Sequence, residues 1–196
     1  AFSQSIADGV SKLTGVSETA ITPGTFIVEE AATAIRDYAE AGYDLVIAHG
    51  SQYGGPLQEI APDFPDTAFA WGTAVDTFGL DNVSAYTAAS NEGGYVLGVI
   101  AAEVGESIGI VGPIAVGDAK LYVDGFTLGA ESGGAEVSVT YIESFADVAL
   151  ASETAAAFVS NGADVLTGTA QMTVGAIGVA EQEGLLWFGT QSNQTS

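Results

Sequence analysis

The chain alternates between two patterns of apolar residues, one with the spacing of a helix and one typical of a buried strand. The clearest helical pattern runs up to Gly42, a residue that favours a helix end. Its apolar positions recur every three or four residues, at Ile27, Ala31, Ile35, Tyr38 and Ala39. The next segment, Asp44 to Ala48, is a short apolar run and predicts a strand covered on both faces.

The same patterns predict the other elements. The expected helices cover Ser3 to Thr14, the stretch before Gly42, Pro56 to Ala61, Asn91 to Val104, Asp118 to Ser132, Val148 to Ser160 and Gln171 to Glu183. The expected strands cover Val16 to Ile21, Asp44 to Ala48, Ala68 to Trp71, Val83 to Tyr86, Ser107 to Val111, Glu136 to Tyr141, Asp164 to Thr167 and Leu185 to Phe188. This alternation, with short glycine-marked connections, predicts an α/β fold with parallel sheets and helices on both faces.

The layout occurs twice in the chain. Gly42-Tyr43-Asp44-Leu45-Val46 returns as Gly162-Ala163-Asp164-Val165-Leu166. Phe69-Ala70-Trp71-Gly72-Thr73 and Leu186-Trp187-Phe188-Gly189-Thr190 then close the two corresponding blocks. A repeated α/β block predicts two lobes, with a cleft between them that could hold a small molecule.

The boundary between the lobes is expected near residues 87–90. This gives an N-terminal lobe at residues 1–87 and a partial C-terminal lobe at residues 88–196. No linker rich in Pro or Ser separates them, so the connection is expected to be a hinge strand.

The charge balance excludes several partners. The chain has 25 Asp and Glu residues against Lys12, Arg36 and Lys120, giving a formal charge of -22. Nucleic acid and anionic membrane surfaces are bound through clusters of Lys and Arg, so neither is an expected partner. Such an acidic chain suits a high-salt or secreted protein, because about 1 M salt screens its self-repulsion, and an acidic mesophilic protein is the alternative.

The sequence lacks the parts of a catalytic or metal centre. His49 is the only histidine, cysteine is absent, and no nucleophile elbow, phosphate loop or dinucleotide-binding fingerprint occurs. The remaining metal-binding residues are carboxylates scattered through predicted helices and loops. We therefore expect no enzyme activity, no catalytic residue, no metal and no cofactor.

Ligands of open parallel sheets bind beyond the carboxyl ends of the strands, which makes the residues there the candidates for binding. His49 is either a ligand contact or a rim residue bonded to water or backbone. Phe145 could stack on a planar ligand. Gln191 and Asn193 could bind a ligand or belong to a simple loop, whereas helix capping alone would explain Glu92.

Two further signals are weaker. Trp71 and Trp187 lie within apolar strands and are expected in the core. Asn82-Val83-Ser84 and Asn193-Gln194-Thr195 match the glycosylation acceptor pattern, which often arises by chance.

Six segments in the same order resemble the basic membrane protein (Bmp) family of extracytoplasmic solute-binding proteins, which serve nucleoside-type ABC importers. They are Ala39 to Gly50, Phe64 to Thr67, Asn82 to Ser84, Asn91 to Gly98, Gly125 to Ala130 and Asn161 to Val165. The resemblance implies a type I periplasmic-binding fold, with two α/β lobes that close on a ligand. It also implies a permease as partner, nucleosides as the leading ligand class and similarity to purine nucleoside receptor lipoproteins.

The chain departs from the family pattern at both ends. A strand expected before Phe2 and the C-terminal return segment are not in the sequence. Where the family has Gly-Val-Asp-Ser-Asp-Gln, this chain has Gly189 to Gln194, so amides replace carboxylates that would bond ribose hydroxyls. Phe2 occupies an aromatic position of the family. Either this sequence is part of a longer chain that contains the missing strand, or a neighbouring chain completes the N-terminal sheet by self-association.

These observations predict a solute-binding protein that captures a small polar aromatic ligand, a nucleoside or a base, by hinge closure. The expected ligand-binding residues are Phe2, His49, Glu92, Phe145, Gly168, Gln171, Gln191 and Asn193. The expected location is the cell surface or periplasm, with the full-length protein anchored to the membrane. The alternative is a structural or assembly protein of the same fold that has lost its ligand site.

Overall fold

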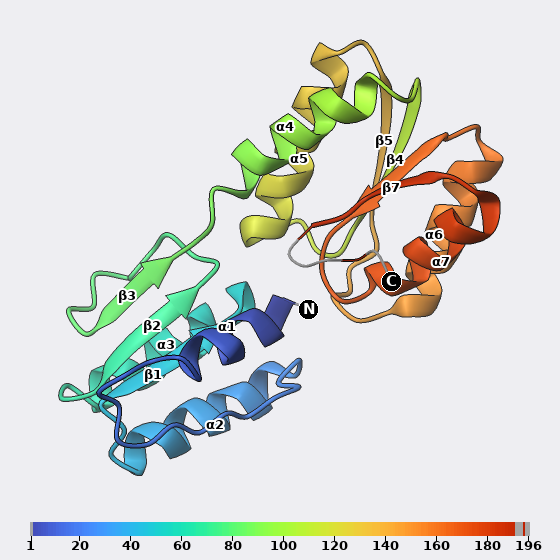
Figure 1. The fold of residues 1–196 in the computed structure, drawn as a ribbon. Helices are drawn as coiled ribbons and strands as arrows, with labels where there is room; N and C mark the ends of the chain where they lie inside the picture. The colour runs from blue at the N-terminus through green and yellow to red at the C-terminus, as the bar shows by residue number, and fades with distance from the viewer. Residues whose placement is uncertain (1, 191–193, 195–196) are drawn as a thin grey trace. The chain divides into compact units, whose positions relative to one another are not determined.

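The computed structural model describes residues 2–190 and residue 194, with side chains from residue 6 onward. Its strands form two separate parallel sheets, ordered β1-β2-β3 and β5-β4-β6-β7 (Figure 1). Contacts within the chain define two compact units, one covering Ser3–Ala88 and the other containing the chain from Ala89. The parallel strands and their helical connections confirm the predicted α/β class.

The N-terminal unit builds its core between the sheet and the helices that flank it. Its elements are α1 (Phe2–Val10), α2 (Val28–Glu40), β1 (Leu45–His49), η1 (Ser51–Tyr53), α3 (Gly54–Ile60), η2 (Ala61–Asp63), β2 (Ala68–Gly72) and β3 (Val83–Tyr86). Phe69 of β2 and Leu57 of α3 are buried, together with Ile35 of α2. Helix α2 ends before Gly42, as predicted, because Gly42 has a φ of 82° that suits glycine.

The predicted strand at Val16 to Ile21 is wrong, because this segment has no regular secondary structure. A strand needs a partner for its backbone groups, and no strand of the described chain pairs with this one. Val16 and Ile21 are 49% and 57% exposed. A β-branched pattern alone therefore does not form a strand here.

Tyrosine hydroxyls hold the surrounding segment to the unit instead. Tyr38 Oη lies 2.6 Å from Thr22 Oγ1, and Tyr43 Oη donates to a carboxylate oxygen of Glu18 at 3.1 Å. Tyr53 Oη donates to the carbonyl oxygen of Thr25 at 2.7 Å. Side-chain hydrogen bonds thus replace the expected ladder.

Helix α1 is shorter than predicted, ending at Val10 and not at Thr14. The backbone tightens there, since the amides of Lys12 and Leu13 bond to carbonyls three residues back. Gly9 lies within this last turn and weakens the helix, which favours the early end.

The second unit places its central strands between two pairs of helices. Its elements are α4 (Ser90–Ala102), β4 (Ser107–Gly112), α5 (Gly117–Ser132), β5 (Glu136–Tyr141), α6 (Val148–Ser160), β6 (Val165–Gly168), α7 (Thr173–Glu183) and β7 (Leu186–Phe188). Ile110 packs in the cluster formed with α4 and α5, whereas its neighbour Val111 packs with α6 and α7. Successive strand residues face opposite sides, so helices cover both faces of this sheet.

Glycines allow α4 and α5 to pack backbone against backbone. A Cβ built on Gly98 would lie 2.2 Å from a carbonyl oxygen of α5, and one on Gly129 would lie 2.1 Å from a carbonyl oxygen of α4. The corresponding distances at Gly94 and Gly125 are 2.5 Å and 2.1 Å. These four glycines belong to the sequence segments that carry the family resemblance, and their role is helix packing.

The Asn82 side chain fastens the loop before β2 to the start of β3. Its Nδ2 lies within hydrogen-bonding distance of three carbonyl oxygens, at 3.0, 3.0 and 3.1 Å, which belong to Ala61, Phe64 and Thr67. A glycan would be attached at this same nitrogen. The amide of the Asn82-Val83-Ser84 motif therefore has a structural use in the folded protein.

Replacing Asn82 with alanine is expected to destabilise the N-terminal unit by about 1–3 kcal/mol, because all three carbonyl oxygens lose this hydrogen bond and those of Ala61 and Phe64 keep only a backbone amide as donor. Asn82→Asp is expected to cost more, since a carboxylate would face the same oxygens. Urea unfolding followed by circular dichroism measures both changes. Ser84→Ala is the control: it removes the same sequence motif at an exposed site, and an equal loss there would contradict the role of the amide.

Candidate functional site

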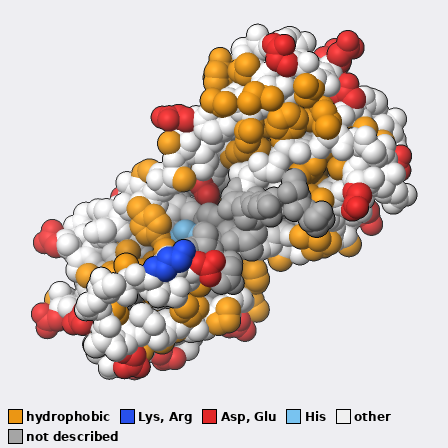
Figure 2. Space-filling view, in the orientation of Figure 1, with side chains coloured by type: hydrophobic (Ala, Val, Ile, Leu, Met, Phe, Trp, Pro, Cys, Tyr) orange, Lys and Arg blue, Asp and Glu red, His pale blue; other side chains and the backbone are white. Residues whose placement is uncertain are grey.

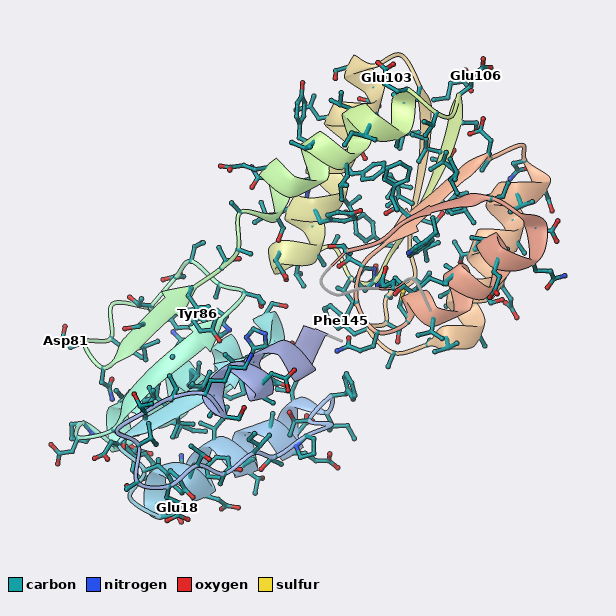
Figure 3. All side chains as sticks on the ribbon, in the orientation of Figure 1. Glu18, Asp81, Tyr86, Glu103, Glu106 and Phe145 are labelled. Atoms are coloured by element: carbon teal, nitrogen blue, oxygen red, sulfur yellow. The ribbon has the colours of Figure 1, made fainter. Side chains whose placement is uncertain are left out.

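The three strands of the N-terminal unit bring His49, Gly72 and Tyr86 together at their carboxyl ends. Strand pairing aligns Gly72 with His49 on one side and with Tyr86 on the other. His49 Nδ1 lies 2.8 Å from Tyr86 Oη, and the two rings are stacked with centroids 5.8 Å apart at 15°. Figure 3 labels Tyr86 at the end of β3.

Gly72 leaves the space that this ring pair occupies. A Cβ at position 72 would lie 2.5 Å from His49 Nδ1 and 2.7 Å from Tyr86 Oη. Any larger residue at position 72 would separate the rings. Predicted site residue His49 therefore lies at the strand ends, as expected, and is fixed there by a tyrosine that the sequence did not single out.

Both rings of this pair are uncharged at neutral pH. Burial lowers the pKa of His49, and it raises the pKa of Tyr86. A neutral imidazole and a phenol can each donate or accept a hydrogen bond. The strand ends of this unit thus present neutral hydrogen-bonding groups.

Trp71 lies next to this pair but belongs to the core. It is 8% exposed, and its indole N–H donates to the carbonyl oxygen of Gly50 at 2.9 Å. Its ring stacks on Phe78, with centroids 5.3 Å apart at 19°. The expected core position of Trp71 is confirmed.

In the second unit, Phe145 lies in the loop that follows β5 and is half-buried. Figure 3 labels it. Two backbone amides donate to Ser144 Oγ, and Asp147 caps α6 by accepting from Leu150 N at 2.9 Å. These contacts fix the loop on both sides of the aromatic ring.

The Phe145 loop contacts the loop between β6 and α7. The backbone amide of Met172 donates to the carbonyl oxygen of Phe145 at 3.1 Å. Two predicted site residues, Gly168 and Gln171, lie in that second loop or at its start. The structure therefore brings Phe145 close to the segment that contains Gln171.

Gly168 has a packing role that the sequence did not reveal. A Cβ there would lie 2.6 Å from the carbonyl oxygen of Val111, so glycine permits the close approach of β4 and β6. The preceding residue of β6, Thr167, donates from its hydroxyl to the carbonyl oxygen of Phe188 at 2.8 Å. Tyr122 Oη lies 2.7 Å from the same Thr167 Oγ1. Burial raises the pKa of Tyr122.

The remaining predicted site residues are not drawn into a shared arrangement. Glu92 is exposed in the first turn of α4, and its carboxylate makes no hydrogen bond or ion pair with the part of the chain that is described. Phe2 begins α1, but its side chain lies outside the described residues, as do Gln191 and Asn193.

Gln194, which was not among the predicted binding residues, contacts Trp187. Gln194 Oε1 accepts a hydrogen bond from the indole N–H of Trp187 at 2.8 Å and one from the amide of Thr190 at 3.3 Å. Trp187 is half-buried against the core formed with α6 and α7. It was expected in the core, and it packs at the margin.

Thr73, Glu143 and Ala170 share an unusual backbone conformation close to strand ends. Each follows a strand of a sheet, and their φ angles of 65°, 54° and 75° lie in the left-handed region. Such conformations are strained for residues other than glycine and occur often at functional sites. A sequence gives no sign of this strain, so Thr73 was missed.

Among residues 2–190 and 194, no group of three or more His, Cys, Asp and Glu side chains lies close enough to hold a metal ion. None of the helices described is both long enough and apolar enough to cross a bilayer.

Comparison with known proteins extends these observations. The chain is 33% identical over 168 residues to a purine-binding protein from Brucella abortus (strain 2308), covering 84% of this chain and 47% of that protein. The chain thus spans about half the length of this curated relative.

Two solved structures share the fold. An ABC transporter solute-binding protein from Aeropyrum pernix K1 matches with a TM-score of 0.79 and 25% identity, over 93% of this chain and 54% of that one. One from Conexibacter woesei DSM 14684 matches with a TM-score of 0.70 and 25% identity, over 95% and 64%. The expected periplasmic-binding-protein-like fold is therefore confirmed.

The family model for PnrA-like ABC transporter substrate-binding proteins, Bmp, matches residues 1–195. The chain belongs to the Bmp family of ABC transporter substrate-binding proteins.

Proposed function

We propose that the protein captures a nucleoside or a free purine base outside the cytoplasm and delivers it to an ABC permease. The observation that carries this proposal is the 33% identity to a purine-binding protein over 84% of the chain. The family supports the class of transport protein, and the purine-binding relative suggests the ligand class.

The chemistry of the strand ends supports a neutral aromatic ligand. His49 and Tyr86 offer uncharged hydrogen-bonding groups, and Phe145 offers a ring for stacking. The sequence has only three Lys and Arg residues, and two of them form ion pairs, Arg36 with Asp63 and Lys120 with Asp124. A nucleoside or base therefore suits this chain better than a phosphorylated nucleotide, whose phosphate needs positive charge.

The proposed binding residues retain the assignments made from the sequence. Phe2 or Phe145 would stack on the base, and its polar edges or the ribose would bond to His49, Glu92, Gln171, Gln191 and Asn193. The backbone beside Gly168 would approach the ligand. Contacts available only when the two lobes close would shift the population toward the closed form, which the permease would recognise.

The proposal predicts ligand-specific stabilisation. In high salt, adenosine, inosine, adenine or hypoxanthine at about 100 times its Kd should raise Tm by roughly 5–10 °C, because binding at that excess stabilises the folded state by about 2.7 kcal/mol. Differential scanning fluorimetry of the intact protein, with calorimetric titration of the best ligand, measures this.

Adenosine monophosphate and glucose are the controls, since both are expected to leave Tm unchanged. A shift with glucose and none with any purine would contradict the ligand class. The intact mass of the natively purified protein, measured in parallel, would show the length of the chain that binds.

A second candidate function is assembly, favoured by the edge of the N-terminal sheet. Strand β1 pairs only with β2 within the described chain, so its other edge has backbone groups available for another strand. In this alternative a neighbouring copy would complete the sheet. Light scattering after size exclusion distinguishes the two, since transport predicts a monomer that binds purine and assembly predicts a stable oligomer without purine binding.

A further inference from the structure

Thr73 combines two features that normally carry a cost. Its φ of 65° places a β-branched residue in the left-handed region, which glycine adopts without steric strain and β-branched residues do not. Its side chain is also buried, with 6% of the residue exposed. A sequence under no functional demand would place glycine or asparagine here.

The hydroxyl of Thr73 has no hydrogen-bond partner in the described part of the chain. Buried hydroxyls are nearly always bonded, because an unpaired one loses the hydrogen bonds that water supplied. By contrast, the buried hydroxyl of Thr173 donates to the carbonyl oxygen of Ala170 at 2.8 Å. The Thr73 hydroxyl is therefore available to bond a group outside the described chain.

Thr73 lies directly beside the candidate site in the chain. Thr73 directly follows Gly72, the residue that pairs with His49 on one side and Tyr86 on the other. Its backbone leaves the sheet at the edge where the His49 and Tyr86 rings stack over Gly72. The three strand ends of the N-terminal unit thus contribute an imidazole, a phenol and a buried hydroxyl.

We infer that Thr73 is a ligand-contacting residue whose hydroxyl bonds a neutral donor or acceptor group of the bound nucleoside or base. The strained backbone holds the hydroxyl at the strand ends before the ligand arrives, so binding costs no further ordering of this side chain. Tyr86 acts as a positioning residue, because it holds the His49 ring through Nδ1. This inference rests on the proposed function and adds a residue and a ligand-group chemistry to it.

Thr73→Val tests the inference, because valine keeps the shape and removes the hydroxyl. The expected result is a Kd for the best-binding purine, measured by calorimetric titration, that rises about tenfold or more. Tm without ligand should stay the same or rise, since the variant buries no unpaired hydroxyl. A structural role for the hydroxyl would give the opposite result, a lower Tm with unchanged Kd.

Two further variants make the test specific. Thr73→Ser keeps the hydroxyl, and its Kd should stay within about threefold of the wild type. Thr33→Val makes the same change on α2 of the same unit, where the hydroxyl bonds Glu29 within the helix, and should leave Kd unchanged.

Each outcome has one meaning. A Kd unchanged in Thr73→Val, with purine binding intact in the wild type, would overturn the inference and leave the proposed function standing. Equal losses in Thr73→Val and Thr73→Ser would also overturn it, since the hydroxyl would then not be the group that matters. A wild type that binds no purine would instead refute the proposed function.

Discussion

Gly98→Ala is expected to lower the free energy of unfolding of the second unit by more than about 3 kcal/mol, or to prevent its folding. The added methyl would lie 2.2 Å from the carbonyl oxygen of Phe126 and 2.7 Å from the amide nitrogen of Ala130. Both obstacles are backbone atoms, so no side chain can rotate away. The helices α4 and α5 would have to separate, and the tight packing along their whole contact would be lost.

The matched control lies in the same helix. A Cβ at Gly93 would meet nothing within 4 Å, so Gly93→Ala should stabilise the protein by roughly 0.5–1 kcal/mol through helix propensity alone. Urea unfolding followed by circular dichroism compares both variants with the wild type. Similar effects at positions 93 and 98 would show that the close approach of these helices is not what the glycines provide.

Raising the salt concentration from 0.1 to 1 M NaCl is expected to raise Tm by about 10 °C. The formal charge of -22 produces strong self-repulsion, and the Debye length falls from about 10 Å to about 3 Å over this range. Figure 2 shows carboxylates spread over the visible surface of both units. A Tm that does not change between these salt concentrations would contradict this account.

Part of the electrostatic repulsion arises at helix C-termini, where carboxylates lie beside the negative end of the helix dipole. Helices α2 and α7 have no basic residue in the last turn, and each ends on a glutamate, Glu40 and Glu183, beside the negative end of the helix dipole. In 0.1 M salt, Glu183→Gln should therefore stabilise by about 0.3–1 kcal/mol.

The matched variant Glu30→Gln changes the same residue type in the first turn of α2, where a carboxylate is favourable, and should destabilise by a similar amount. Both effects should vanish in 1 M salt, and Tm measured for each variant at both salt concentrations tests this. Effects of the same sign at the two helix ends would rule out the dipole as their cause.

Most helices and strands were predictable because their patterns reflect burial that the fold then provides. The apolar run of β4 is buried, as a strand between helices must be, and Gly42 and Gly162 have the positive φ angles expected of helix-ending glycines. The repeated aspartate also has a structural reason. Asp164 accepts hydrogen bonds from the amides of Glu106 and Ser107, at 2.9 and 3.1 Å, which joins the starts of β4 and β6.

The sequence-based predictions are wrong or incomplete where the structure of a segment depends on residues far away in the chain. The segment Val16 to Ile21 has strand-forming residues, but a strand exists only beside another strand, and pattern analysis cannot supply the partner. Gly168 shows the same limit: its ligand contact stays a prediction, whereas the close approach to the backbone of Val111, which a Cβ would meet at 2.6 Å, depends on strand pairing and could not be predicted from its place after a strand.

The candidate site was half predictable for a related reason. The rule that ligands bind beyond strand ends identified His49 and Phe145, because strand ends can be located from the sequence. Tyr86 also ends a strand, but its pairing with His49 depends on sheet order and on the space above Gly72. The strain at Thr73 is a property of the backbone, and threonine is an ordinary residue in a sequence.

The contact between α4 and α5 also determines how this sequence can change over evolutionary time. An exposed carboxylate can be exchanged by a single substitution, because its side chain does not lie between packed backbones. A first step away from glycine at Gly98 or Gly129 meets backbone atoms, so no single compensating substitution in the facing helix can restore the fit. We therefore expect the spacing of these glycines to outlast changes of ligand, which would make it a better marker of distant relatives than the binding residues.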